Sequence, residues 1–217
     1  RRFVADASHE LKTPLTVILT NTGILLAHSG DTIAQQQKWV EYIGDEAQRM
    51  RALVEDLLFL AKSDAGKETA PVTAPVDVSE LTWSALLPFE EMESEIADQL
   101  TVQGNADQLR RLVAILLDNA VKYAGNGGRV KLVLSRPERG GVCLAVHNTG
   151  PAIPPEHLPH LFERFYRADD SRARTSGGYG LGLAIAKRIV DGHGGSIAVS
   201  SGEDAGTDFT VRLPHSQ

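Results

Sequence analysis

Residues 106–123 of this chain read ADQLRRLVAILLDNAVKY. The apolar residues of this stretch recur at spacings of three and four, which is the repeat of one face of an α-helix. We therefore predict a long amphipathic helix whose apolar side packs against a neighbouring layer of the protein. That side consists of Leu109, Leu112, Val113, Leu116 and Leu117.

Short apolar segments around this helix predict a small sheet with further helices. Some are separated by turns that contain Pro and Gly, which is typical of neighbouring strands. Because helices precede and follow the strands on one side, we expect residues 76–217 to fold as a two-layer α/β sandwich. The predicted strands are residues 129–135, 142–147, 196–201 and 208–213, and the further helices are residues 78–87 and 181–192.

The first 66 residues predict a different domain, a hairpin of two amphipathic helices that is broken at Ser29-Gly30-Asp31. A hairpin alone cannot cover both apolar seams, so we expect a homodimer whose two hairpins form a four-helix bundle. Residues 67–75 contain two Ala-Pro pairs and are predicted to be a linker. The seams comprise Val4, Ser8, Leu11, Leu15, Ile18, Thr22 and Leu25 in the first helix, and Val40, Ile43, Ala47, Met50, Val54, Leu57 and Ala61 in the second.

The composition narrows the possible functions. The chain has 217 residues with 22 basic and 28 acidic side chains, and this net charge of −6 argues against a general nucleic-acid partner. The single cysteine, Cys143, excludes an internal disulfide framework and a cysteine-based zinc site, and its apolar neighbours predict a buried strand thiol. No apolar stretch reaches the roughly 18 residues of a membrane span. The chain starts at Arg1 inside a helical pattern, so we expect a piece of a longer protein.

His9 is the first candidate for chemistry. It lies about 140–180° around the helix from the apolar seam and should therefore point outward. It could simply be a solvated histidine, but Glu10 follows it directly, and an exposed imidazole beside a carboxylate is a competent nucleophile. Thr13 stands where a zinc-binding HExxH motif would need a second histidine, so that motif is excluded.

A second group of candidates lies in the predicted sandwich. Asn119 and Lys122 are about one helical turn apart and could offer an oxygen to Mg²⁺ and an ammonium to phosphate, although a buried asparagine is often only structural. Two glycine-rich turns, at residues 148–152 and 177–182, could let backbone N–H groups approach a polyphosphate. Either turn alone could equally be an ordinary turn.

Five motifs along the chain, taken in order, resemble the H, N, G1, F and G2 boxes of the bacterial sensor histidine kinases of two-component systems. The resemblance covers essentially the whole chain. The motifs are Ser8-His9-Glu10-Leu11-Lys12-Thr13-Pro14, Asp118-Asn119-Ala120, Asn148-Thr149-Gly150, Phe162-Glu163-Arg164-Phe165-Tyr166-Arg167 and Gly178-Tyr179-Gly180-Leu181-Gly182-Leu183.

The resemblance implies a dimerisation and phosphotransfer hairpin followed by a catalytic domain with the Bergerat fold of Hsp90-like ATPases. It implies that the γ-phosphoryl group of Mg²⁺·ATP passes to His9 with help from Glu10, and then to an aspartate of a response regulator. Thr13 would orient water for a phosphatase reaction, Asn119 would bind Mg²⁺, and residues 167–178 would form an ATP lid. The implied nucleotide-binding residues are Asn119, Lys122, Tyr123, Asn148, Gly150, Ile153, Phe162, Arg167, Gly178, Tyr179, Gly180, Leu181, Gly182 and Leu183.

The chain departs from the family pattern at several positions. Asn148 replaces the aspartate whose carboxylate accepts a hydrogen bond from the adenine amino group, so we expect a weaker bond there. Ala152 replaces a glycine, and Ile115 replaces a polar residue that precedes the main asparagine by four positions. The segment from Phe89 to Leu100 is shorter than in the family, which leaves open whether a strand or helical turn is missing.

Two other functions fit parts of the sequence. A dimeric scaffold that binds ATP poorly would explain the departures, but it would not need His9, Glu10 and Asn119. An ATPase of the Hsp90 or mismatch-repair type would not need an exposed His-Glu pair on a hairpin. The resemblance also implies that this piece lies in the cytoplasm and that the parent protein is anchored in the bacterial inner membrane.

Overall fold

The structure is a computed structural model that describes residues 2–64, 74–89, 92–125, 127–138, 140–168 and 178–214. The chain divides into two compact units, residues 1–66 and 67–217. Among the described residues, no helix combines the length and the apolar character that crossing a membrane requires.

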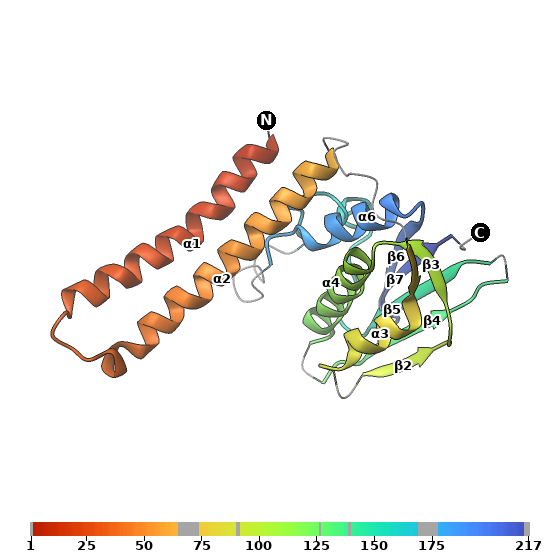
Figure 1. The fold of residues 1–217 in the computed structure, drawn as a ribbon, viewed down its shortest axis with the longest axis horizontal. Helices are drawn as coiled ribbons and strands as arrows, with labels where there is room; N and C mark the ends of the chain where they lie inside the picture. Colours follow the sequence, from red (N-terminus) through yellow and green to blue (C-terminus); the bar gives the residue numbers. More distant parts are fainter. Residues whose placement is uncertain are drawn as a thin grey trace. The chain divides into compact units, whose positions relative to one another are not determined.

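The first unit is a helical hairpin, which confirms the prediction. Helices α1 (Arg2–Ala27) and α2 (Ile33–Asp64) run side by side in opposite directions (Figure 1). A reciprocal capping pair starts α2: the backbone N–H of Thr32 donates to Oε1 of Gln35 at 2.8 Å, and the backbone N–H of Gln35 donates to Oγ1 of Thr32 at 3.4 Å. This pair satisfies donors that the first helical turn leaves free, so the sequence fixes where α2 begins.

The helix surfaces follow the predicted seams only in part. Val4, Leu15 and Val40 belong to these seams but are exposed in the single chain, whereas Pro14 and Asn21 are buried. A hairpin of two helices buries only the face that each helix turns to the other, so part of each seam stays on the surface. Helix α1 runs through Pro14 without a break.

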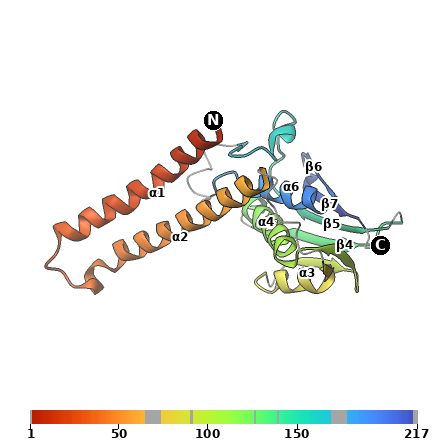
Figure 2. The same ribbon diagram turned by 45° about the horizontal axis from the view of Figure 1, so that its top comes forward.

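The second unit is the predicted two-layer α/β sandwich. Its five-stranded sheet has the order β2-β4-β5-β7-β6, in which only the β2–β4 pair is parallel, and β1 and β3 form a separate antiparallel pair. Helices α3, α4 and α6 lie on one side of the large sheet (Figure 2). The elements are β1 (Ala74–Asp77), α3 (Val78–Leu86), β2 (Glu93–Ile96), β3 (Thr101–Gly104), α4 (Ala106–Ala124), β4 (Val130–Ser135), β5 (Val142–Asn148), the 3₁₀ helix η1 (Leu158–His160), α6 (Gly182–Gly192), β6 (Ser196–Gly202) and β7 (Gly206–Leu213).

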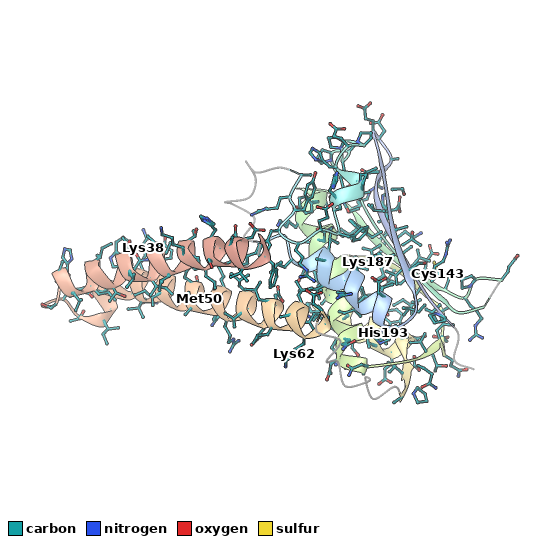
Figure 3. All side chains as sticks on the ribbon, turned by 90° about the horizontal axis from the view of Figure 1, so that it is seen from above. Lys38, Met50, Lys62, Cys143, Lys187 and His193 are labelled. Atoms are coloured by element: carbon teal, nitrogen blue, oxygen red, sulfur yellow. The ribbon has the colours of Figure 1, made fainter. Side chains whose placement is uncertain are left out.

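Helix α4 buries the apolar side that its sequence predicts, together with Ala120. Its first turn is capped by Asn105, whose side-chain oxygen accepts the backbone N–H of Gln108 at 3.0 Å. Strand β5 alternates between buried and half-exposed side chains, and Cys143 falls on the half-exposed face (Figure 3). The prediction of a buried thiol was therefore wrong, because the two-residue repeat of a strand turns every second side chain away from the helices.

Three strands were not predicted from the sequence. Ala74 and Pro75, placed in the linker, lie in β1, where proline is tolerated because β1 has a partner on one side only. The short segment from Phe89 to Leu100 still forms β2, which pairs with β4 at the edge of the sheet. One strand is therefore present in this segment.

Candidate functional site

The last two turns of α4 carry the predicted polar residues. Asn119 and Lys122 are half-buried, and Tyr123 is exposed. The Nζ atom of Lys122 lies 5.2 Å from the centre of the Tyr123 ring, within the range of a cation–π contact. Lys122 and Tyr123 follow Asn119 by three and four residues, so both side chains are neighbours of Asn119 on the helix surface.

A second cation lies near Lys122. Burial of the ammonium group, and after it the charge of Arg167, hold the pKa of Lys122 below its ordinary value. A Cβ added to Gly178 would lie 3.0 Å from Nζ of Lys122, so the backbone of the G2 motif also comes close. Two neighbouring cations repel each other, and a bound anion would relieve that repulsion.

The end of β5 supplies a hydrogen-bond acceptor. Asn148 is buried; its Nδ2 donates to the carbonyl of Thr149 at 2.9 Å, and its Oδ1 has no partner among the described residues. Leaving a buried acceptor unpaired costs free energy that a ligand donor would recover. The amino group of adenine is such a donor, so Asn148 fits the adenine end of a nucleotide.

The loop after Asn148 is tied to α4 and to the sheet. Gly150 has a φ of +140°, and a Cβ at this position would lie 2.3 Å from the carbonyl oxygen of Tyr123. Farther along, the backbone N–H of Ile153 donates to Oγ of Ser201 at 2.9 Å. The close approach of Gly150 to Tyr123 therefore places the loop that follows Asn148 next to the polar end of α4.

Replacing Gly150 with alanine is expected to lower the free energy of unfolding of the second unit by about 1–3 kcal/mol, from backbone strain at positive φ and the contact with Tyr123. Gly140→Ala is the matched control, because Gly140 also has a positive φ, +79°, but nothing lies within 4 Å of its added Cβ. Urea unfolding followed by circular dichroism measures both variants. Equal losses would contradict the close approach of Gly150 to α4.

The turn at the start of α6 also lies close to α4. Gly180, with a φ of +70°, accepts the backbone N–H of Phe165 at 2.9 Å, and Leu181 is buried directly before the helix. A Cβ added to Gly182 would lie 3.4 Å from Cγ2 of Ile115, so the isoleucine that replaces a polar family residue packs beneath this turn. The first N–H groups of a helix attract anions, which suits the turn from Gly180 to Leu183 for phosphate.

Not every predicted residue converges on this site. The Phe162 ring makes an edge-to-face contact with Phe209 of β7, at 6.5 Å between ring centres, which favours an anchoring role in the core. Tyr179 and Leu183 are half-buried. Most of the predicted lid, residues 169–177, lies outside the described residues.

The predicted acceptor lies in the hairpin. The His9 side chain is exposed on α1, as its position opposite the seam predicts. Glu10 is half-buried, Thr13 is exposed, and Pro14 is buried. An exposed imidazole next to a carboxylate can be reached by another molecule or domain, which a phosphoacceptor requires.

Comparison with known families places both units. The His Kinase A (phospho-acceptor) domain matches residues 1–66, and the family of histidine kinase-, DNA gyrase B-, and HSP90-like ATPases matches residues 104–217. The sensor histidine kinase YkoH of Bacillus subtilis is 38% identical over 220 residues, which cover 98% of this chain and 47% of YkoH. The chain belongs to the sensor histidine kinases. It spans about half the length of the curated sensor kinases it matches.

Two further sensor kinases are informative. The signal transduction histidine-protein kinase/phosphatase MprB of Mycolicibacterium paratuberculosis is 38% identical over 227 residues, covering 98% of this chain and 42% of MprB. The crystal structure of full-length ShkA in complex with AMPPNP aligns with a TM-score of 0.70 and 26% identity, covering all of this chain and 46% of ShkA. The matches therefore extend over both units, which favours a histidine kinase over an isolated Hsp90-type ATPase.

Sequence reasoning missed Thr207 in this sensor kinase. Thr207 is buried opposite Asn148 in the β5–β7 pair, and its Oγ1 lies 2.8 Å from Oγ of Ser201. A Cβ at the preceding Gly206 would lie 2.3 Å from the carbonyl oxygen of Asn148. The sequence did carry a signal, because Thr207 is the polar residue in the buried phase of β7, which continues with Phe209 and Val211.

Two other histidines of the sensor kinase have local structural partners. His193, at the end of α6 (Figure 3), is buried; its Nε2 accepts the backbone N–H of Asn105 at 3.1 Å, and its Nδ1 lies 2.7 Å from the carbonyl of Ile189. This geometry fixes the neutral tautomer with the proton on Nδ1 and joins the ends of α6 and α4. Nδ1 of His147 lies 3.0 Å from Oδ1 of Asp208.

Proposed function

We propose that this chain is a protein-histidine kinase that phosphorylates itself on His9 and passes the phosphoryl group to an aspartate of a response-regulator receiver domain. The observation that carries the proposal is the buried Oδ1 of Asn148, which has no partner among the described residues. The loop that follows Asn148 approaches the end of α4 at Tyr123, next to Lys122, and the charge of Arg167 acts on Lys122. An acceptor for adenine and a cation pair for phosphates are the two ends of an ATP site. Membership of the sensor histidine kinases supports the same function.

The chain's own groups suit each part of the nucleotide. Oδ1 of Asn148 would accept the adenine amino group, and the ring of Tyr123, beside Lys122, would lie at the rim of the site. Lys122 and Arg167 would face the phosphates, together with the backbone N–H groups from Gly178 to Leu183. The side-chain oxygen of Asn119 is a ligand type that Mg²⁺ accepts. The bound ion would neutralise charge on the phosphates during transfer.

The chemistry is a phosphoryl transfer in two steps. A ring nitrogen of His9 attacks the γ-phosphorus of ATP, the bond to the β–γ bridging oxygen breaks, and ADP leaves with that electron pair. The Glu10 carboxylate next to His9 would accept the imidazole proton. A carboxylate oxygen of the regulator then attacks the phosphorus and releases the imidazole. Most of the catalytic effect comes from positioning and charge neutralisation.

We also propose a phosphatase reaction. Thr13, exposed about one turn after His9, would orient a water molecule that hydrolyses the phosphorylated regulator. The name of MprB, a kinase/phosphatase, supports this assignment.

We further propose that the chain is a homodimer. Exposed apolar side chains of the hairpin, among them Leu15, Val40 and Val54, would be covered by a second hairpin in a four-helix bundle. The regulator would dock on the hairpin near His9. In the cell we expect this piece to face the cytoplasm, in a parent protein anchored in the membrane.

Replacing Asn148 with leucine is expected to weaken ATP binding about 10-fold, the value of one hydrogen bond of about 1.4 kcal/mol. The free energy of unfolding should not fall, because losing the bond from Nδ2 to Thr149 is offset by removal of the unpaired Oδ1. Titration calorimetry with ATP and urea unfolding measure the two quantities. Unchanged ATP affinity in a folded variant would contradict the adenine assignment.

A further inference from the structure

The segment around η1 surrounds the Tyr166 side chain with polar and aromatic groups. Nδ1 of His157 lies 2.6 Å from the Tyr166 hydroxyl, and the centre of the His160 ring lies 5.3 Å from that of Tyr166. His160 is in turn paired with Glu163, at 2.6 Å between Nδ1 and the carboxylate. The hydroxyl of Tyr166 is therefore bonded to a side chain nine residues earlier in the chain.

The backbone next to Tyr166 has an unusual conformation. Phe165 has a φ of +62°, which is unfavourable for a bulky residue and persists only where neighbouring groups hold it. On one side, the backbone N–H of Phe165 donates to the carbonyl of Gly180. A Cβ added to Gly180 would lie 2.8 Å from the carbonyl carbon of Phe165. On the other side, the bond from His157 to Tyr166 fixes the next residue.

Arg167 follows immediately. Its charge is, after burial, the second cause that lowers the pKa of Lys122, so the Arg167 guanidinium lies in the same region as that ammonium group although like charges repel. Holding a long, flexible side chain there requires a fixed backbone. The residue directly before Arg167 is Tyr166, and the hydroxyl of Tyr166 is hydrogen-bonded to His157.

We propose that His157 is a positioning residue for the nucleotide: its hydrogen bond to Tyr166 fixes the backbone from Phe165 to Arg167 and so keeps the Arg167 guanidinium beside Lys122, ready for a phosphate. This role rests on the proposed function of the site as an ATP site. It does not depend on which of the two groups donates the proton, because the neutral imidazole and the phenol can form the bond in either direction.

The test compares His157→Leu, which cannot form the bond, with His157→Asn, whose amide lies close to the position of Nδ1. Tyr166→Phe removes the other partner. His147→Leu is the matched control, because His147 is also half-buried and bonded through Nδ1, to Asp208. ATP affinity is measured by calorimetry on the whole chain. KM for ATP and kcat are taken from autophosphorylation, and thermal unfolding checks the fold.

His157→Leu and Tyr166→Phe should each weaken ATP binding about 5–10-fold and raise KM by a similar factor, with a smaller change in kcat. The double variant should be no worse than either single variant, since both remove the same bond. His157→Asn should recover most of the affinity, and His147→Leu should bind ATP as the wild type does.

Wild-type ATP affinity in a folded His157→Leu chain would overturn the role of His157 and leave the kinase proposal standing. Full additivity in the double variant, or no recovery with asparagine, would also overturn it. If the variants change ATP affinity as expected but the wild-type chain takes up no phosphate, the kinase proposal is overturned and His157 is supported as a positioning residue. A wild-type chain that binds no ATP would overturn both the kinase proposal and the role of His157.

Discussion

Replacing His9 with glutamine is expected to abolish transfer of phosphate from γ-labelled ATP to this chain. The amide nitrogen of glutamine is not a nucleophile, whereas the exposed imidazole of His9 is. Glutamine is a good helix former, so α1, ATP binding and dimerisation should be unchanged. The measurement is incubation of the purified chain with Mg²⁺ and labelled ATP, followed by acid and alkali treatment. Phosphohistidine is labile to acid and stable to alkali.

His28→Gln is the matched control, because His28 is also exposed and directly follows α1. It should label as the wild type does. Label that persists in His9→Gln would place the acceptor elsewhere. A wild-type chain that binds ATP without becoming labelled would favour the dimeric scaffold over the kinase.

Replacing Asn119 with alanine is expected to slow labelling about 10²–10³-fold, the typical loss when one preorganised group that stabilises transition-state charge is removed. Asn119 is half-buried on the polar side of α4, one turn before Lys122 and Tyr123. Without its oxygen, Mg²⁺ would be held less firmly beside the phosphates. The initial rate of labelling over a range of Mg²⁺ concentrations measures the effect.

Two control variants accompany Asn119→Ala. Asn119→Asp keeps an oxygen ligand and should retain far more activity than the alanine variant. Gln108→Ala, about three turns earlier on the same helix, should label normally. A normal rate and normal Mg²⁺ dependence in Asn119→Ala would remove this residue from the metal site.

The elements that could be predicted from the sequence are those with a long local pattern. The hairpin of α1 and α2, the helix α4 and the antiparallel strands β4 to β7 show a clear repeat over at least six residues. The three missed strands, β1, β2 and β3, have four residues each. So short a segment shows little periodicity, and β2 pairs with β4, which lies more than thirty residues later in the chain.

For the site, the sequence identified the motifs but not all the contacts that hold them together. Asn148, Gly150 and Lys122 were expected near one nucleotide, and local contacts place them around the end of α4. Thr207 and the bond between His157 and Tyr166 were not foreseen. Such contacts depend on strand register and on irregular loop backbone, and neither follows from residue spacing.

The position of Cys143 offers a practical route to the assembly of this protein. Because it is the single cysteine of the chain and is half-exposed on the side of the sheet away from the helices, a thiol-reactive spin label would attach at one known point per molecule. Two chains in a dimer would then give a single electron–electron distance. Recording that distance with and without ATP would reveal movement of the labelled sheets without introducing a mutation.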